Sequence, residues 1–271
     1  NCAGGPTPWG SWISCEELVA KKGSRKEKSG LITFEKDHGY QFEVPAVLDG
    51  GLVDPVPLKP IGRVKHEAIA VDPRSGIVYQ TEDQNDGLLF RFIPDEKEQL
   101  RAGTLQALVV KDQPSIDTRN WKKTRFKLGD KVNVDWMDIG PEPVDGKDLR
   151  LIGFGKGAAR FARGEGMWWD GEGGIYFACT NGGAKQLGQI WRLWPGENEL
   201  ELFAEPNDSS IVVNADNLTV SPFGDLVVCE DRKGDVVRLL GVTPEGKFYI
   251  FANNHKRTEF CGVVFSPDGS T

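Results

Sequence analysis

The residues best suited to chemistry are acidic and amide side chains that recur where strand-like segments begin or end. Buried together, so many carboxylates would repel one another, and some would have to take up protons unless cations neutralised them. Clustered oxygen ligands suit hard ions such as Ca²⁺, and a thiolate would add affinity for ferric iron. Asp and Asn are also common in ordinary turns, so a purely structural role stays open. The recurrent residues are Cys2, Glu16, Glu17, Glu67, Glu82, Asp83, Glu165, Asn181, Asp216, Asn217, Glu230, Asp231 and Glu259.

One basic residue stands close to this set. Arg163 lies two positions before Glu165, and residues two apart in an extended chain point to the same side. A guanidinium beside a metal-bound carboxylate can bind a phosphate group through two parallel hydrogen bonds. The alternative is an ion pair that only anchors Glu165.

These residues belong to a repeat. In its clearest copy, Glu67 leads an apolar strand, a Pro/Gly turn and a second apolar strand, which ends at Glu82 and Asp83. By spacing, Cys2 and Glu17 correspond to Glu67 and Glu82, since 15 positions separate each pair. Copies begin at Cys2, Glu67, Glu165 and Asp216, and a fifth begins at Glu259.

Each copy predicts more than one hairpin. A third strand with a glycine start follows at residues 30–34, 87–92, 188–193 and 234–239, and fourth strands are expected at 200–204 and 248–251. Four-stranded antiparallel units that recur in this way predict an all-β fold, a β-propeller whose inner strands bring the recurrent residues to one channel. We expect a single domain over residues 1–271, with a polar insertion at about 112–147 forming a loop or small subdomain beside the channel.

Composition narrows the function classes. The chain has 271 residues and a net charge of −7, so it has no general attraction for nucleic acid or an anionic membrane. No apolar run reaches the roughly 20 residues that span a bilayer. Five cysteines without a CxxC pair argue against a disulfide framework or structural zinc, and three histidines argue against a histidine-built zinc site. The chain starts without Met and stops after a turn, so we expect both ends to be cut from a longer protein.

Several motifs together resemble the PhoX-type alkaline phosphatases. The opening motif is NCAGGPTPWGSW at residues 1–12 with CEE at 15–17. The same family order continues with KHEA at 65–68, YQTED at 79–83, RGEG at 163–166, DNLT at 216–219 and EFCG at 259–262. The resemblance covers essentially the whole chain. It implies a six-bladed propeller in the full protein and an exported, periplasmic or secreted enzyme that hydrolyses phosphomonoesters.

The resemblance also implies a metal centre with two oxo-bridged Fe³⁺ ions and additional Ca²⁺ ions. Carried over by motif, the iron ligands are Cys2, Glu17, Glu67 and Glu165. The calcium ligands are Glu82, Asp83, Asp216, Asn217 and Glu230. The resemblance also implies that Arg163 holds the phosphate, as the catalytic and substrate-binding residue. We expect a monomer that binds small phosphomonoesters, with neither nucleic acid nor membrane as a partner.

Two other functions remain open at this point. A calcium-dependent lactonase or esterase also uses Glu, Asn and Asp in a propeller channel, but it needs neither the thiol of Cys2 nor a phosphate-binding Arg163. A non-catalytic propeller could use metal only to join its blades. Channel carboxylates would explain that protein too, but they would not explain an arginine beside Glu165.

Overall fold

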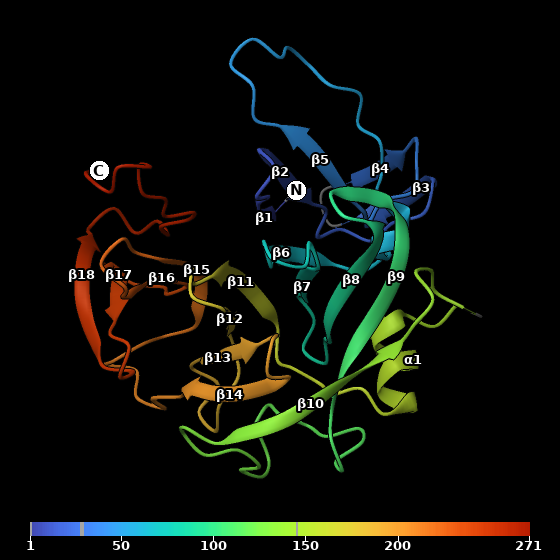
Figure 1. Ribbon diagram of the computed structural model, residues 1–271. Helices are drawn as coiled ribbons and strands as arrows, with labels where there is room; N and C mark the ends of the chain where they lie inside the picture. The colour runs from blue at the N-terminus through green and yellow to red at the C-terminus, as the bar shows by residue number, and fades with distance from the viewer. Residues whose placement is uncertain (1, 28–29, 145) are drawn as a thin grey trace.

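The computed structural model describes residues 2–27, 30–144 and 146–271, so Asn1 of the opening motif lies outside the described residues. Its strands form sheets that radiate from a shared set of inner strands (Figure 1). The first sheet holds β1 (Cys2–Pro6), β2 (Ser11–Cys15) and β5 (Gln41–Pro45), and the second β6 (His66–Val71), β7 (Val78–Glu82), β8 (Leu89–Glu96) and β9 (Gln99–Val110). The third holds β11 (Gly164–Trp169), β12 (Ile175–Cys179), β13 (Gln189–Trp194) and β14 (Glu199–Ala204), and the fourth β15 (Ala215–Val220), β16 (Leu226–Glu230), β17 (Val237–Val242) and β18 (Phe248–Asn254).

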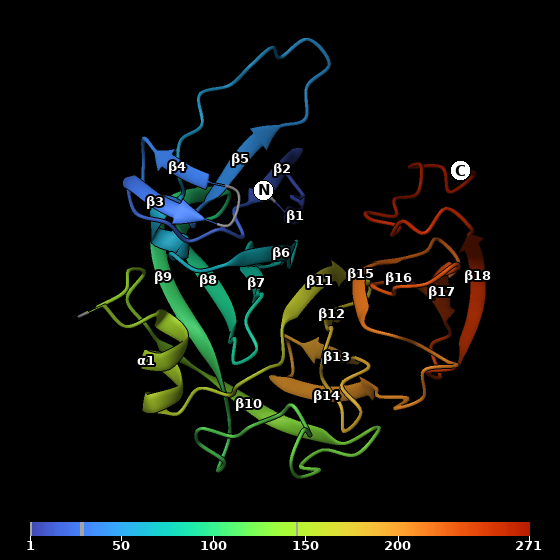
Figure 2. The same cartoon turned by 180° about the vertical axis from the view of Figure 1, so that it is seen from behind.

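The inner strands β1, β6, β11 and β15 lie next to one another, and the other strands of each sheet lie further out (Figures 1 and 2). β1 pairs with β6 in parallel through Gly4 and Ala68, and β11 packs against both β6 and β15. Successive strands within a sheet are antiparallel. This arrangement confirms the predicted all-β propeller. The number of blades in the full protein stays a prediction.

Each inner strand carries a β-bulge at the same place. The irregular step lies between Cys2 and Gly5 in β1, and the corresponding steps are 66–69 in β6, 164–167 in β11 and 215–218 in β15. The shared bulge makes Ala3, Glu67, Glu165 and Asp216 equivalent positions. Cys2 is therefore equivalent to His66, one residue before Glu67, so aligning the copies by spacing misplaced the first one.

The third strand of the first sheet also differs from the prediction. Residues 30–34 form β4 (Gly30–Phe34), which pairs with β3 (Gly23–Glu27) in a separate exposed hairpin. β5 takes the predicted place beside β2, because Gln41 at its start is fully buried and hydrogen-bonds to Gln80 in the second sheet. By contrast, β4 is exposed along most of its length.

The insertion reaches the outer edge of the sheets. Its strand β10 (Lys131–Asp138) pairs with β9 on one side and β14 on the other, joining the second and third sheets. With the β1–β6 pair, this joins the first three sheets into one continuous 12-stranded sheet, whereas the fourth remains separate. The helix α1 (Leu149–Lys156) follows it, and the short helix η1 (Lys59–Ile61) precedes β6. Residues 255–271 contain no strand in the described structure. Phe260, Val263 and Phe265 of this predicted fifth copy pack instead against Val227 and Cys229 of β16.

The sheets are held together by apolar side chains between them. One buried cluster combines Tyr79, Leu89 and Leu108 of the second sheet with Phe177 and Trp191 of the third. Phe161, just before β11, meets both of those aromatic rings edge to face, with centroids 5.5 and 5.7 Å away. Aromatic side chains contribute most per residue to such contacts, so this cluster fixes β11 relative to β6.

Glycine allows the inner strands to approach closely. A Cβ atom at Gly5 of β1 would lie 2.3 Å from the carbonyl oxygen of Ile69, and one at Gly166 of β11 would lie 2.5 Å from the amide nitrogen of Leu218. Both contacts are backbone, which cannot move aside as a flexible side chain could. Only glycine fits at these positions.

We therefore expect Gly166→Ala to destabilise the fold by about 1–3 kcal/mol or more, the usual cost of overpacking. The measurement is the free energy of unfolding in denaturant. Gly140→Ala is the control, because Gly140 is exposed and an added Cβ would meet nothing within 4 Å. Equal stability of the two variants would contradict the close packing of β11 on β15.

Candidate metal centre

Three potential metal ligands converge at the end of the inner strands where β1 and β6 begin. One ligand atom from each of Cys2, Glu17 and Glu67 lies within 4.8 Å of the others. Cys2 opens β1, Glu67 is the second residue of β6, and Glu17 lies two residues beyond β2. Burial raises the pKa of Glu67 to about 7, helped by the charge of Glu17 and opposed by a hydrogen bond from Cys2. Burial and Glu67 in turn raise the pKa of the Cys2 thiol.

Arg163 is held firmly beside these ligands. Its Nε lies 2.7 Å from Asp83 Oδ1, and its Nη2 lies 3.1 Å from Asp83 Oδ2 and 2.8 Å from Glu165 Oε1. Its backbone has a φ of 46°, and its N–H donates to the carbonyl oxygen of Gln84 at 2.8 Å. The predicted ion pair with Glu165 is therefore present. A third of the Arg163 side chain remains exposed, so the guanidinium can still meet a ligand.

The acidic groups act on one another across all four sheets. Burial first, then the charges of Asp216, Asp83 and Glu67, raises the pKa of Glu165 to about 11. Burial raises the pKa of Asp216 to about 6. It also raises that of Glu17, which shares a hydrogen bond with Asp83. We call these residues the carboxylate cluster: Glu17, Glu67, Asp83, Glu165 and Asp216.

The donor set fits a metal centre. Among the described residues, Arg163 and Lys65 lower pKa values in the carboxylate cluster, and its five carboxylates outnumber these two cations. Buried carboxylates in excess must be protonated or paired with added cations. Carboxylate oxygens are ligands for hard ions, and the Cys2 sulfur beside Glu17 and Glu67 adds a donor that suits iron.

Two residues predicted as calcium ligands have other partners. Glu82 is buried and accepts a hydrogen bond from the Leu88 N–H. Burial raises its pKa to about 8, opposed by that hydrogen bond and by the charge of Arg150. Glu230 is fully buried and binds Arg238 at 2.8 and 2.5 Å and the Val213 N–H at 2.7 Å. These contacts favour a structural role for both carboxylates over metal binding.

The register explains where these two side chains lie. Glu82 is paired with His66 and Glu230 with Ala215, each one residue before a member of the carboxylate cluster. Neighbouring strand residues point to opposite faces. His66 accordingly lies in a separate buried network, with Nδ1 3.1 Å from Gln41 Nε2, and burial lowers its pKa to about 4. Asn217, the last predicted ligand, is half-buried on the bulge of β15, beside Asp216.

Sequence reasoning missed two residues near the cluster. Lys65 lowers the pKa of Glu17. Its position two before Glu67, like that of Arg163 before Glu165, was a signal that could have identified it. Cys261 lies where the charges of Asp216 and Glu67 raise its pKa after burial does, and its only signal was its place in the EFCG motif.

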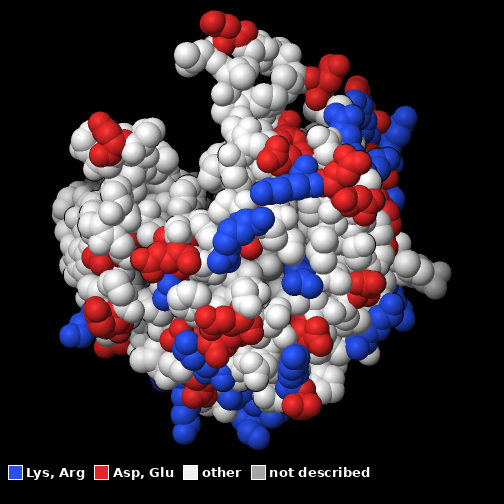
Figure 3. Space-filling model, in the orientation of Figure 1, with Lys and Arg blue, Asp and Glu red and all other residues white. Residues whose placement is uncertain are grey.

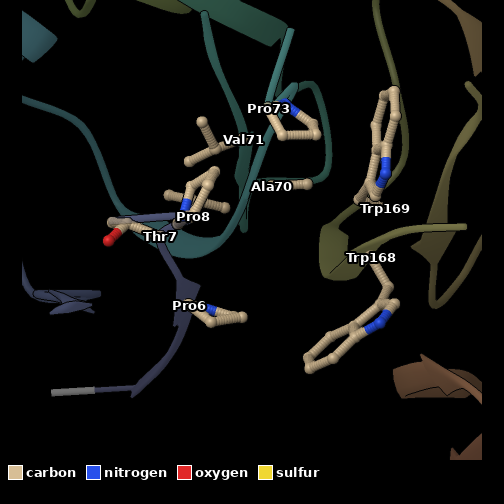
Figure 4. Close-up of a pocket in the computed structure, with 9 residues that line it drawn as sticks. Pro6, Thr7, Pro8, Ala70, Val71, Pro73, Trp168 and Trp169 are labelled. Carbon is tan, nitrogen blue, oxygen red and sulfur yellow. The ribbon is translucent and has the colours of Figure 1, made fainter. Parts of the chain in front are cut away.

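A cavity lies at the other end of the inner strands, and Figure 4 shows the residues that line it. It has a volume of about 240 Å³, and Pro6, Ala70, Val71, Trp168 and Trp169 contribute to its walls. No lining residue is ionisable, so this cavity lacks groups that would bind an anion or a metal. The titratable groups lie at the opposite ends of β1, β6 and β11.

Charges of both signs are intermixed over the face seen in Figure 3. In the described part of the chain, no helix is long and apolar enough to cross a membrane.

The raised pKa values predict how metal-free protein responds to pH. A carboxyl group whose pKa is higher in the folded state stabilises the fold below its unfolded value of about 4.5, and that stability is lost as pH rises through the folded pKa. The free energy of unfolding of chelator-treated protein should therefore fall from pH 5 to pH 8, by up to about 1.4 kcal/mol per pH unit for each proton lost.

Glu165→Gln, which resembles the protonated acid, should make this decline shallower. The exposed Glu96→Gln is the control and should leave the slope unchanged. An unfolding free energy that rises across this pH range would contradict the electrostatic description of the cluster.

The comparisons with known proteins agree with this fold. The chain aligns with the solved structure of Pseudomonas fluorescens PhoX in complex with vanadate, a transition state analogue, at a TM-score of 0.71 and 20% identity. The alignment covers 99% of this chain and 63% of that chain, so the present chain spans less than two thirds of its relative. At this identity the likeness shows the shared fold.

Other matches are weaker. The PQQ-bound aldose sugar dehydrogenase from Streptomyces coelicolor aligns at a TM-score of 0.30 and 15% identity, over 90% of this chain and 86% of that chain, which is too low for a structural argument. No curated protein matches the sequence significantly. The model of the family described as alkaline phosphatase PhoX matches residues 1–271, and the chain therefore belongs to the PhoX alkaline phosphatase family.

Proposed function

We propose that the protein hydrolyses phosphomonoesters at a metal centre built on the carboxylate cluster, with Arg163 binding the phosphoryl group. The observation that carries this proposal is the placement of Arg163 between Asp83 and Glu165, inside a cluster whose excess negative charge calls for cations. The solved structure of the Pseudomonas fluorescens relative contains vanadate, a transition state analogue, which supports the same reaction here.

The proposed metal ligands combine the family resemblance with the donor groups present. Cys2, Glu17 and Glu67 would hold iron with Glu165, and Asp83, Asp216 and Asn217 would supply oxygen ligands to calcium. Bound cations would act as Lewis acids on the phosphoryl oxygens and turn an acidic, anion-repelling site into one that attracts a phosphate dianion.

Arg163 itself would orient the phosphoryl group and neutralise charge on its equatorial oxygens. Two bonds to Asp83 and one to Glu165 fix its guanidinium before substrate arrives, so little side-chain freedom is lost on binding. The same pairing keeps Arg163 protonated, because Asp83 raises its pKa.

We further propose that the full protein has six blades, acts as a monomer and is exported to the periplasm or secreted, where it releases phosphate from small phosphoesters. The alternative function, which the tests below distinguish from a phosphatase, is that of a calcium-dependent lactonase. It would contain calcium without iron and would not depend on Arg163.

Arg163→Ala should lower turnover of a phosphomonoester such as p-nitrophenyl phosphate by about a hundredfold or more, the usual effect of removing a transition-state donor. Metal content, measured on the same samples, should stay close to that of the wild type. Arg101→Ala is the control, since Arg101 is exposed on β9. Unchanged turnover would remove Arg163 from the mechanism.

Cys2→Ser should reduce iron per chain before it reduces calcium, because a hydroxyl is a poorer ligand for iron than a thiolate. Elemental analysis of protein purified without added metal or chelator measures both. Cys179→Ser is a matched control, because Cys179 is fully buried on β12 and bears no proposed ligand role. Full retention of iron by the Cys2 variant would refute the thiolate ligand.

A further inference from the structure

A cavity of about 360 Å³ lies beside β5 in the first sheet. Most of its lining comes from two chain segments, residues 36–42 and 55–59, and Glu16 completes it. A volume of this size is usual for sites that bind small molecules. The question is therefore which ligand the lining suits.

Backbone contacts hold both segments in place. The Glu16 N–H donates to the carbonyl oxygen of Tyr40 at 3.0 Å, and the Leu58 N–H donates to that of Gln41 at 2.9 Å. An isolated β-bridge also joins the two segments. The cavity is thus formed before a ligand arrives, which lowers the entropic cost of binding.

Part of the lining is apolar and rigid. Phe42 is half-buried on β5, and Pro55 and Pro57 belong to the same lining. The Tyr40 ring is nearly buried, and its hydroxyl donates to Glu142 Oε1 at 2.9 Å. Aromatic and proline rings of this kind suit a flat apolar ligand.

The two acidic groups of the lining already have partners. Glu16 accepts hydrogen bonds from His38 Nδ1 at 2.7 Å and from two backbone N–H groups at 2.8 and 3.1 Å. Asp37 accepts from Lys21 Nζ at 3.0 Å and from a backbone N–H at 2.7 Å. Both negative charges are therefore compensated within the protein.

The two lysines of the lining lack such partners. Across residues 2–27, 30–144 and 146–271, neither Lys36 nor Lys59 forms an ion pair or a side-chain hydrogen bond. Lys59 Nζ lies 5.9 Å from the centroid of the Tyr40 ring, so this cation is close to the aromatic part of the lining. Because the acids are paired and the lysines are not, the lining attracts an anion.

This cavity is distinct from the candidate metal centre, although Glu16 directly precedes Glu17. Glu17 shares a hydrogen bond with Asp83 in the carboxylate cluster. The hydrogen bonds of the Glu16 carboxylate all come from residues 38–40. Glu16, one of the recurrent acids of the sequence, thus belongs to this cavity and not to the cluster.

We propose that the cavity binds a small aromatic anion. Its flat ring packs against Phe42 and the two prolines, and its acidic group pairs with Lys36 and Lys59. The inference does not depend on the proposed phosphatase function, because neither lysine belongs to the metal centre. The probe for the test is naphthalene-2-sulfonate, an aromatic anion without a phosphoryl group.

The test is calorimetric titration of the metal-loaded full chain with this probe. Lys36→Met and Lys59→Met should each raise the Kd by about threefold to tenfold, between the effects of an exposed ion pair and of a charge-assisted hydrogen bond. Lys59→Arg should keep most of the affinity, and uncharged 2-naphthol should bind the wild type more weakly than the sulfonate. Lys111→Met, at an exposed position beyond β9, is the matched control.

The outcomes separate this site from the metal centre. Absence of saturable binding at one site per chain would overturn the proposal, and so would wild-type affinity in both methionine variants. Loss of binding in Arg163→Ala but not in the lysine variants would place the probe at the metal centre instead. If binding follows the two lysines while p-nitrophenyl phosphate is not hydrolysed, this site stands and the proposed function falls.

Discussion

Mutual repulsion among buried carboxylates is the constraint on which this structure depends. Burial and neighbouring charges raise the pKa values of Glu67, Glu165 and Asp216, so the folded chain holds these groups in a state that water would not favour. Such an arrangement persists only because the rest of the fold supports it. The apolar cluster between the second and third sheets and the glycine contacts of the inner strands supply that support, since they fix the strands that carry the acids.

The sequence repeat places residues that are far apart in the chain together in the carboxylate cluster. The inner strands all begin at the same end of the fold, and each has a β-bulge at the same position. The second residues of these strands therefore lie close together. Three of those positions hold Glu67, Glu165 and Asp216, while the fourth holds Ala3. In the first sheet the neighbouring Cys2 and the loop residue Glu17 provide the donors instead. The sulfur atom of Cys2 thus lies beside the carboxylate cluster because the first repeat departs from the others.

Much of this could be predicted from sequence, because hairpin patterns and acidic strand ends are local signals. The β-bulge could not be predicted, since it adds one residue without changing the apolar pattern. Because of the bulge, Cys2 is equivalent to His66 and not to Glu67. The exposed hairpin of β3 and β4 resembled a core strand by its leucine and isoleucine alone. Helix α1 was hidden by its glycines, although Gly153 is what allows the helix to pack on Leu88. Which basic residue pairs with a given carboxylate, such as Arg238 with Glu230, depends on the tertiary structure and could not be predicted from local sequence.

Variation at one repeated position also explains how a repetitive fold acquires an uneven distribution of positive charge around the carboxylate cluster. The residue two before the strand acid is lysine in the second sheet, arginine in the third and asparagine in the fourth. Identical residues at all three would surround the axis evenly and leave no preferred side for an anion. With cations on two adjacent sheets, and an asparagine committed to the backbone on the next, positive charge gathers on one side of the carboxylate cluster. Under the proposed function, this asymmetry would direct the phosphoryl oxygens of a substrate toward Arg163.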